Sequence, residues 1–349
     1  LLSEMYHMSL KDLIRLRIRL GLNCINCFDL INEDIPNEGL LKDPFLSELR
    51  KLLNIDTASD EFQSILFQVI PYAIPMSYVE NFWYYVKMIN NLPYHKVVVS
   101  AAGWNGNTFF QYYASESLMK GAKLIEVQHG GCYGYTLLSP SETMALNKDF
   151  FFTWGWLGEG RNRCKPLPSP YLSCLKNTSV GKIDRLLFVG TDAARYKHRI
   201  DLVLFPDDIE KYFNDKKIFI SKLPVTLIKK LMYKPRKDMG WNEVDFIKAI
   251  NPYVEILISK PLTDWMKKIK IVVIDHPYTT ILEALTINVP SVFFWDHDIF
   301  FMRAEAEPYF QLLRDVGILY KNPEGAARKV NEIFDDPMEW WHSNTVQNA

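Results

Sequence analysis

A chain of 349 residues, 48% of them apolar and 14% aromatic, can bury the cores of about two domains. Its 40 basic and 41 acidic side chains leave a net charge of -1, so no whole-protein field for nucleic acid is expected, although local basic patches remain open. The sequence has no apolar run long enough for a membrane helix and no basic-then-apolar leader, which makes a globular, cytoplasmic protein the expectation.

The cysteines and the first residue bear on compartment and completeness. Five scattered cysteines are an odd number for a disulfide framework, and a reduced compartment suffices for them. Cys24 and Cys27 form one CxxC pair without a second pair, which argues against zinc. The chain opens on Leu1 instead of methionine, so a fragment that lacks the start of its first domain is one interpretation.

The first part of the chain is predicted to contribute packing helices. Residues 4–30 have helix-like apolar spacing, and residues 62–90 are strongly apolar and aromatic. Pro71 and Pro75 interrupt the second segment, because proline lacks a backbone N–H and its ring clashes with the preceding turn. The prolines are therefore expected to end one helix, and another helix is expected to begin at Tyr78.

Alternating strands and helices follow. Residues 96–100 (KVVVS) are the first clear strand, because the run is short, apolar and β-branched. A helix over 108–120 and a strand over 124–127 complete a βαβ unit, which predicts neighbouring parallel strands. Residues 150–156 are expected to form a last buried strand of this first domain.

A proline-rich stretch separates two halves of the chain. Pro166, Pro168 and Pro170 indicate a linker, so we place a first domain at 1–180 and a second at 181–349. Two βα domains in tandem predict a cleft between them, where ligands commonly bind. In the second domain the predicted strands are 185–190, 254–259, 271–274 and 291–295, and the predicted helices are 207–214 and 280–287.

A histidine stands where the strand over 124–127 ends, within Gln128-His129-Gly130-Gly131. The carboxyl ends of strands in open α/β sheets bind ligands, so His129 is expected at a ligand site. The alternative is a histidine held by a turn carbonyl, with glycines that serve only backbone geometry.

The most informative segment follows the strand over 271–274. Asp275 and His276 come directly after it, and two threonines then open a helix whose amino end faces the sheet edge. Unpaired N–H groups and the helix dipole make such a place an anion site, where Thr279 and Thr280 add hydroxyl donors for phosphate. Glu283, one turn into the helix, is placed to accept hydrogen bonds from ribose hydroxyls. The alternative is a capping box over Thr280 and Glu283, which would leave Asp275 and His276 unexplained.

Two basic loop clusters are weaker candidates for phosphate or anionic sugar. The first, within residues 190–199, contains Arg195, and the second contains Lys234 and Arg236, with Trp241 near enough in sequence to stack a base. Charge runs are more often solvated faces, which is the alternative for both clusters.

Two further features are weighed against simpler explanations. Trp104 and Asn105, in residues 101–106 (AAGWNG), are candidates for the acceptor side of the cleft, and a tight turn is the equal alternative. Residues 296–298 (DHD) have metal-binding side chains, but neighbours on an extended chain point to alternate faces, so no bound metal is expected.

Three motifs in chain order carry a resemblance to a known family. Residues 128–134 (QHGGCYG), 153–156 (TWGW) and 275–285 (DHPYTTILEAL) resemble bacterial surface-polysaccharide transferases with the GT-B fold. Those are similar to capsule transferases acting on CMP-activated ulosonic acids such as Kdo, and more distantly to CDP-glycerol glycerophosphotransferases of teichoic acid synthesis. The resemblance spans roughly residues 62–340. It implies an α/β fold with two Rossmann-like βαβ domains facing across a cleft, and extra N-terminal helices.

The resemblance also implies a function. The leading interpretation is a glycosyltransferase that moves a CMP-activated ulosonic acid from its nucleotide onto a glycan or lipid-linked acceptor, without a further cofactor. His276 would contact the phosphate, and His129 would deprotonate the acceptor hydroxyl, a task that suits an imidazole. Candidates on the nucleotide side are Asp275, Thr279, Thr280, Glu283, Arg195, Lys234 and Arg236, and candidates on the acceptor side are Gln128, Gly130, Gly131, Trp104 and Asn105.

The chain departs from related enzymes in one respect. Sialyltransferase-like enzymes of this fold carry a carboxylate base in an Asp-Gly or Glu-Asp-Gly setting, which is missing here at the expected place. Glu126 shares a strand face with Gln128 and not with His129, so the base and the stereochemical outcome stay open. The alternatives in function are a CDP-glycerol or polyol phosphotransferase and a catalytically silent scaffold. Residues 11–19 are a weak candidate for peripheral contact with the inner face of a membrane.

Overall fold

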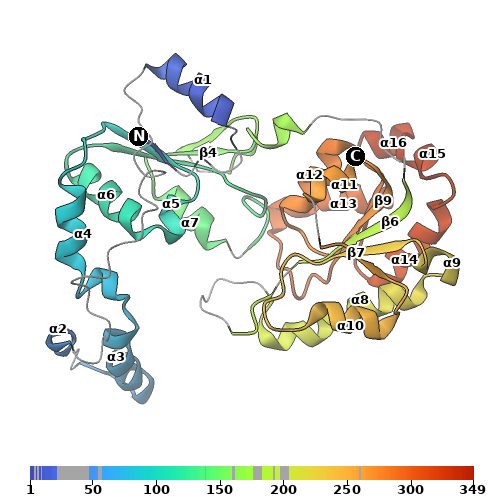
Figure 1. The fold of residues 1–349 in the computed structure, drawn as a ribbon, viewed down its shortest axis with the longest axis horizontal. Coiled ribbons are helices and arrows are strands. Elements are labelled where there is room, and N and C mark those ends of the chain that lie inside the picture. The colour runs from blue at the N-terminus through green and yellow to red at the C-terminus, as the bar shows by residue number, and fades with distance from the viewer. Residues whose placement is uncertain are drawn as a thin grey trace. The chain divides into compact units, whose positions relative to one another are not determined.

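The chain packs into two compact units (Figure 1). Unit 1 comprises Leu1–His129, Met144–Phe152 and Asn162–Lys165, and unit 2 comprises Gly130–Thr143, Thr153–Arg161 and Pro166–Ala349. The predicted domain limits, 1–180 and 181–349, and the predicted cleft stay predictions. The computed structural model describes residues 1–3, 5, 8, 10–21, 47–53, 57–137, 139–158, 162–175, 183–191, 193–196, 204–258 and 261–349.

Unit 1 is built on a five-stranded sheet in the order β1-β2-β3-β4-β5. The strands β1 to β4 pair in parallel, which confirms the parallel βαβ unit predicted from the sequence. Helix α6 (Thr108–Met119) connects β2 to β3 and packs Phe110 into the core beside Val98. The strands are β1 (Leu2–Ser3), β2 (Val97–Ser100), β3 (Lys123–Val127), β4 (Phe150–Thr153) and β5 (Cys164–Pro166).

Two strands of this sheet were not predicted. Strand β1 has only two residues, too few for any periodic pattern. Pro166, which was predicted to belong to a linker, instead ends the edge strand β5 (Cys164–Pro166). Proline is tolerated there because an edge strand leaves one side of its backbone without a ladder partner.

The helices of unit 1 correct one further prediction. Helix α3 (Glu61–Ala73) runs through Pro71, which was expected to end it, and stops at Ile74, the residue before Pro75. Ile74 is extended at ψ 128°, as the residue before a proline tends to be. The next regular helix begins at Phe82 and not at Tyr78. The other helical segments are α1 (Leu10–Leu20), α2 (Glu48–Lys51), η2 (Met76–Tyr78), α4 (Phe82–Ile89) and α5 (Gly103–Gly106).

Helix α1 confirms helical structure within residues 4–30. The CxxC pair Cys24 and Cys27 lies outside the described residues, as does the basic stretch 197–199.

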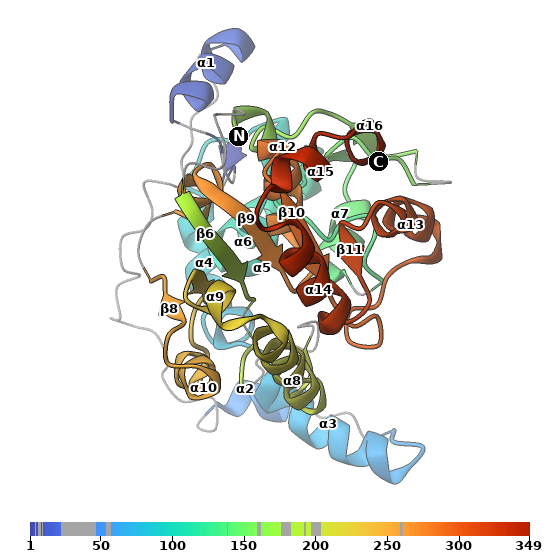
Figure 2. The same cartoon turned by 90° about the vertical axis from the view of Figure 1, so that its right-hand side faces the viewer.

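Unit 2 contains a six-stranded, fully parallel sheet in the order β11-β10-β9-β6-β7-β8 (Figure 2). Renumbered one to six along the chain, the strands follow the order 3-2-1-4-5-6 that defines the Rossmann fold. The prediction of an α/β protein with two parallel sheets is therefore confirmed. The strands are β6 (Ile183–Val189), β7 (Leu231–Lys234), β8 (Glu255–Ile256), β9 (Ile269–Ile274), β10 (Ser291–Phe294) and β11 (Leu319–Tyr320).

Both faces of this sheet are buried under helices. Along β9, Val272 and Ile274 belong to one hydrophobic cluster, whereas Ile271 and Val273 belong to another on the opposite face. Side chains alternate across a strand, so a strand covered on both sides appears as a continuous apolar run, which is why β9 was easy to predict.

Of the helices in unit 2, those predicted at 207–214 and 280–287 are present, and the others were not predicted. Helix α8 (Pro206–Lys222) is longer than the predicted 207–214, because its apolar stripe continues to Phe219 and Ile220. No described helix is both long and apolar enough to cross a membrane. The other helical segments are α7 (Pro140–Leu146), η3 (Leu172–Cys174), α9 (Val225–Ile228), α10 (Glu243–Ile250), α11 (Leu262–Met266), α12 (Thr279–Ile287), η4 (Ala304–Ala306), α13 (Glu307–Asp315), α14 (Pro323–Ile333), α15 (Pro337–Trp341) and α16 (Asn344–Gln347).

The order of strands reverses between β6 and β9, which lie side by side at the centre of the sheet. In open α/β sheets ligands bind outside the carboxyl ends of the strands at this switch point. Gly190 and Thr191 follow β6 there, and Asp275 and His276 follow β9.

Candidate functional site

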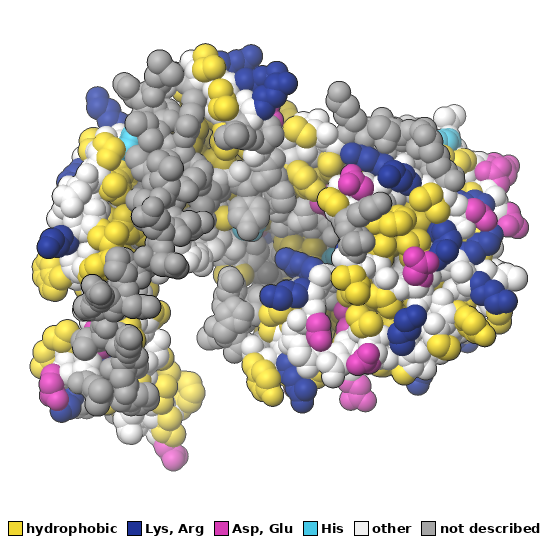
Figure 3. All heavy atoms as spheres, in the orientation of Figure 1, with side chains coloured by type: hydrophobic (Ala, Val, Ile, Leu, Met, Phe, Trp, Pro, Cys, Tyr) yellow, Lys and Arg dark blue, Asp and Glu magenta, His cyan; other side chains and the backbone are white. Residues whose placement is uncertain are grey.

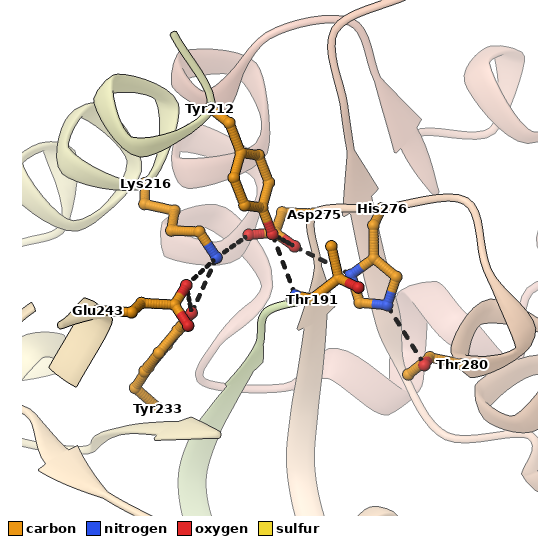
Figure 4. Close-up of polar contacts among 8 residues, drawn as sticks. All are labelled: Thr191, Tyr212, Lys216, Tyr233, Glu243, Asp275, His276 and Thr280. Carbon is orange, nitrogen blue, oxygen red and sulfur yellow. Dashed lines mark hydrogen bonds and ion pairs between the residues drawn. The ribbon is translucent and has the colours of Figure 1, made fainter. Parts of the chain in front are cut away.

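His276 is held by polar groups on both sides of its ring (Figure 4). Its Nδ1 lies 3.0 Å from Asp275 Oδ1, and its Nε2 lies 3.3 Å from Thr280 Oγ1. A carboxylate accepts only, so Nδ1 carries a proton and the other nitrogen faces Thr280. Asp275 and His276 are 2% and 3% exposed, which means that the pair is enclosed by the protein.

A buried lysine, which the sequence did not reveal, lies behind Asp275. Lys216 Nζ lies 2.8 Å from Asp275 Oδ2, 2.9 Å from Glu243 Oε1 and 2.8 Å from the Tyr233 hydroxyl. The ammonium group thus forms ion pairs with two carboxylates and donates a hydrogen bond to the Tyr233 hydroxyl. Tyr233 in turn donates to Glu243.

Asp275 is held on its other oxygen as well. The Tyr212 hydroxyl donates to Asp275 Oδ1 over 2.8 Å and accepts the backbone N–H of Thr191 over 3.0 Å. The Asp275 carboxylate therefore receives hydrogen bonds from Tyr212 and His276 and pairs with Lys216. We call Lys216, Tyr212, Tyr233, Glu243 and Asp275 the buried lysine cluster.

Charge pairing decides the protonation of this cluster. Burial alone would raise the pKa of Asp275, but the Lys216 charge and the His276 hydrogen bond lower it overall. Burial would likewise lower the pKa of Lys216, yet the charges of Asp275 and Glu243 raise it. The pair is thus a buried ion pair, which keeps Asp275 ionised beside His276.

A glycine makes room for the lysine. A Cβ atom on Gly190 would lie 2.1 Å from the Tyr233 hydroxyl and 2.5 Å from Lys216 Nζ, so no other residue fits there without displacing the cluster. The remaining sequence signal is in α8, where Lys216 occupies the same buried stripe as Ile209, Tyr212 and Phe219. A lysine at an apolar position of a helix requires a buried partner.

The glycine motif after His129 packs directly on the amino end of α12, within unit 2. Gly131 N donates to Thr279 Oγ1 over 2.8 Å, and a Cβ on Gly131 would lie 2.7 Å from Thr279 N. The Tyr135 hydroxyl donates to Pro277 O over 2.8 Å. The structure therefore brings together Gly130–Tyr135 and Pro277–Thr279, which the sequence shows only as separate motifs.

The third motif, residues 153–156, contacts the glycine motif through Trp156 and Gly134. Gly134 has φ +83°, and a Cβ there would lie 2.8 Å from the Trp156 ring, so the glycine is needed for both reasons. Gly134 N also donates to Glu142 Oε2 over 2.7 Å, and Arg303 Nη1 lies 2.8 Å from Glu142 Oε1. The third motif thus packs on the glycine motif, which in turn contacts the start of α12.

The capping-box alternative for α12 is wrong. Tyr278 is the N-cap residue, Thr280 is bound to His276, and Glu283 accepts a hydrogen bond from the Tyr171 hydroxyl. Burial raises the pKa of Glu283, against the effect of the Tyr171 hydrogen bond. The ribose-binding role of Glu283 stays a prediction. Among the described residues Thr279 Oγ1 accepts from Gly131 and its hydroxyl hydrogen has no acceptor, so it can donate to an anion.

The predicted basic candidates lie in unit 2, after β6 and at or just after the end of β7. Arg195 is exposed, its guanidinium is 5.6 Å from the centre of the Trp241 ring, and it donates to Gly240 O. Lys234 ends β7, is half-buried, and has its pKa lowered by burial. Arg236 acts on Cys132 through its charge. Burial raises the pKa of the Cys132 thiol to about 12, and the positive charge of Arg236 lowers it. Their contacts with a nucleotide stay predictions.

The acceptor-side candidates include one residue that packing explains. Trp104 in α5 is buried, packs edge-on against Phe110, and donates its indole N–H to Ser100 O over 3.1 Å. Asn105 is half-buried on the same turn, and the backbone N–H of buried Gln128 bonds to Phe152 O. His129 is half-buried at the end of unit 1. None of these contacts tests a role in binding the acceptor.

The acidic residues after β10 form ordinary surface pairs. Lys211 lies within ion-pair distance of Asp296, and Asp298 N donates to Asp296 Oδ1. Within the described part of the chain no three His, Cys, Asp or Glu residues are grouped so that they could hold a metal ion.

Comparison with known proteins gives a family. The LIC12162 family of transferases matches residues 1–349, the whole chain. No curated protein matches the chain significantly.

The similar solved structures are distant. MnaA of Staphylococcus aureus with UDP is 11% identical, covers 77% of this chain and 75% of its own, and has a TM-score of 0.46. A Listeria monocytogenes protein described as a UDP-N-acetylglucosamine 2-epimerase is 12% identical over 76% and 70%, with a TM-score of 0.44. A pneumococcal O-GlcNAc transferase, GtfA, with UDP and GlcNAc is 12% identical over 75% and 55%, with a TM-score of 0.42.

Proposed function

Because the chain belongs to the LIC12162 family of transferases, we propose that it is a glycosyltransferase of bacterial surface polysaccharide synthesis. It would move a sugar from a nucleotide donor to a glycan acceptor, and the proposed donor is a CMP-activated ulosonic acid. The observation that carries the proposal is His276, fixed by Asp275 beside the amino end of α12 at the switch point of a Rossmann sheet.

In the proposed reaction the departing phosphate gains negative charge as the bond to the sugar breaks. The positive end of α12 and the Thr279 hydroxyl favour that charge. In the structure the single hydroxyl hydrogen of Thr280 goes to His276 Nε2, so a phosphate bound by Thr280 would take that hydrogen bond over from the ring. His129 accepts the proton of the acceptor hydroxyl.

The substitution His276→Ala tests the nucleotide site. Isothermal titration of CMP, CDP and UDP into the wild type should show a preference for cytidine nucleotides, and the variant should bind CMP more weakly by about 1.5–3 kcal/mol, the contribution of a charge-assisted hydrogen bond. The matched control is His342→Ala, because His342 is exposed on the surface of unit 2. It should leave all three affinities unchanged.

Other results of the titration point elsewhere. Tight binding of CDP with no binding of CMP would favour a polyol phosphotransferase. A preference for UDP would keep a nucleotide site and replace the donor class. A folded protein that binds no nucleotide would sink the enzyme proposal and favour a silent scaffold.

The proposal includes peripheral contact with the inner face of a membrane through α1. Ile14, Ile18 and Leu20 are 46%, 66% and 60% exposed, and basic side chains lie beside apolar ones on the surface of this helix (Figure 3). An amphipathic helix with exposed apolar residues and cations suits a surface of anionic lipid.

The double substitution Arg15→Glu and Arg19→Glu tests that contact. The wild type should co-sediment with vesicles that contain phosphatidylserine and not with pure phosphatidylcholine. The variant should bind at least about tenfold more weakly, since each cation near the surface contributes about 1 kcal/mol. Lys229→Glu, at an exposed site in unit 2, is the control. Equal binding of variant and wild type would remove α1 from the proposal.

A further inference from the structure

The hydroxyl of Thr280 lies between the imidazole of His276 and the place proposed for the phosphate. Thr280 is half-buried in the first turn of α12, whereas His276 is only 3% exposed (Figure 4). Nδ1 of the ring holds its proton against Asp275, which leaves Nε2 as an acceptor for the Thr280 hydroxyl. A phosphate can therefore contact the Thr280 hydroxyl, and the enclosed ring acts on it through that hydroxyl.

Binding of a phosphate would leave Nε2 without a partner. Once Thr280 donates its hydrogen to the phosphate, the bare lone pair of His276 Nε2 faces the Thr280 oxygen across 3.3 Å. Two acceptors then face each other in a buried place, and a buried polar atom without a partner costs free energy. A proton on Nε2 removes the conflict, because the new N–H donates to Thr280 while Thr280 donates to the phosphate.

The buried lysine cluster can balance the positive charge that such a proton brings. Lys216 carries one positive charge, and the two carboxylates that it pairs with, Asp275 and Glu243, carry two negative charges. Burial raises the pKa of both tyrosines of the cluster, so their hydroxyls are neutral. With a neutral histidine beside it, the cluster therefore holds one surplus negative charge, which favours a cation.

The surplus charge reaches the ring through Asp275. Asp275 Oδ1 lies 3.0 Å from His276 Nδ1, and Asp275 Oδ2 lies 2.8 Å from Lys216 Nζ. Lys216 Nζ also lies 2.9 Å from Glu243 Oε1, so one ammonium group is divided between two carboxylates. Without the charge of Glu243, Lys216 alone would neutralise Asp275. Glu243 in α10 is thus the residue that leaves Asp275 able to support an imidazolium.

One further carboxylate acts on this part of the site. Asp215 in α8 interacts with Asp275 through its charge. Burial and the charges of Asp296 and Asp275 raise the pKa of Asp215 to about 6, and the charge of Lys211 opposes the shift. At pH 7.5 Asp215 is therefore ionised, and it adds to the negative charge that favours an imidazolium.

Other titratable groups lie on the α12 side. Burial raises the pKa of Glu283 in α12. In the glycine motif, burial raises the pKa of Cys132 and Tyr135, and Arg236 acts on Cys132 through its charge. All of these groups stay in place when His276 is replaced, so a proton that they or the phosphate take up would still be taken up by a His276→Gln variant.

We propose that the donor nucleotide binds together with one proton, which goes from the solvent to His276 Nε2, an inference that rests on the proposed function. The imidazolium donates from Nδ1 to Asp275 and from Nε2 to Thr280, and Thr280 donates to the phosphate. His276 is then a positioning residue that acts on the phosphate through Thr280, and Glu243 provides the negative charge that balances the ring.

Titration calorimetry in several buffers measures this proton. The probe is whichever of CMP, CDP and UDP binds most tightly, at pH 7.5 in buffers with different heats of ionisation, such as HEPES, MOPS and Tris. The slope of the observed binding enthalpy against the ionisation enthalpy of the buffer gives the number of protons exchanged. The wild type should take up about half to one proton per nucleotide, and by linkage its affinity should fall by up to about tenfold between pH 7.5 and 8.5.

Three variants locate the proton and the charge that favours it. Glu243→Gln keeps an acceptor for Lys216 and removes the surplus charge, so the uptake should fall below roughly half of the wild-type value. His276→Gln cannot take the proton, and the uptake should be close to zero. Asp245→Asn, at an exposed carboxylate of the same helix as Glu243, is the matched control and should leave the uptake unchanged.

Nitrogen-15 NMR of protein with labelled histidine gives a second readout, in which the His276 signals are those missing from His276→Gln. At pH 7.5 the ligand-free protein should show one protonated and one bare ring nitrogen. Saturation with the nucleotide should protonate both. A purely structural role of His276 would leave its protonation the same in both spectra.

Nucleotide binding without proton uptake, or uptake that persists in His276→Gln, would overturn the inference and leave the proposed function standing. Undiminished uptake in Glu243→Gln would overturn the role of the buried lysine cluster. Absence of binding by all three nucleotides would remove the proposed function, and the inference with it.

Discussion

Replacement of Lys216 by methionine is expected to lower the free energy of unfolding by about 3–5 kcal/mol, the cost of leaving buried charges without their partner. Lys216 is fully buried, and Asp275 and Glu243 both depend on it. Methionine has a similar length and an apolar end, so the core keeps its volume while two carboxylates lose their cation. The effect is therefore electrostatic and not a cavity effect.

Chemical denaturation at pH 7 measures the change, and Lys217→Met is the matched control. Lys217 is the next residue of α8 and is exposed, so its replacement should change stability by less than about 0.5 kcal/mol. Adding Glu243→Gln to Lys216→Met should restore part of the loss, because it removes one of the two unpaired charges. A Lys216→Met protein as stable as the control would mean that the cluster is not the buried ion pair described above.

The strands that were predicted share one property. Buried parallel strands such as β9 carry an apolar residue at nearly every position, because helices cover both faces of the sheet. Strand β7 (Leu231–Lys234) was missed because it has four residues and ends in a lysine before Pro235. Short strands are defined by their neighbours in the sheet, which local sequence does not show.

Only part of the candidate site was predicted, because its other residues are also brought together by contacts that the local sequence does not show. Asp275 and His276 stand out in the sequence because polar residues come directly after an apolar strand. Lys216, Tyr233 and Glu243 come from α8, β7 and α10, and the interactions that join them exist only after the sheet has formed. The packing of Gly131 on Thr279 spans 148 residues and could not be predicted from either motif alone.

In the sequence, Glu126 was assessed only for the strand face on which its side chain lies. The structure shows that its carboxyl group is buried. It lies on β3 between Ser100 of β2 and Phe151 of β4, and it is fully buried. Neither carboxylate oxygen has a hydrogen-bond partner among the described residues. Burial raises the pKa of Glu126 to about 8, although the charge of Lys148 opposes the shift.

The substitution Glu126→Gln is therefore expected to change how stability depends on pH. Between pH 4.5 and 8 the unfolded chain ionises Glu126 whereas the folded protein keeps it protonated, so the folded state binds more protons and the wild type loses stability as pH rises. Glutamine is neutral throughout, so the variant should lack this slope and be more stable than the wild type at pH 8 by up to about 5 kcal/mol.

Urea unfolding of both proteins at several pH values from 5 to 8 measures this difference, with Glu61→Gln, an exposed carboxylate of unit 1, as the control. The two curves should nearly meet at pH 5 and separate steadily toward pH 8. Among the described residues Lys148 is the cation whose charge acts on Glu126, so Lys148→Met should raise the pKa of Glu126 further and extend the loss of stability to higher pH. Parallel curves for the wild type and Glu126→Gln would mean that Glu126 is ionised in the folded protein at these pH values. The prediction of a raised pKa would then be wrong.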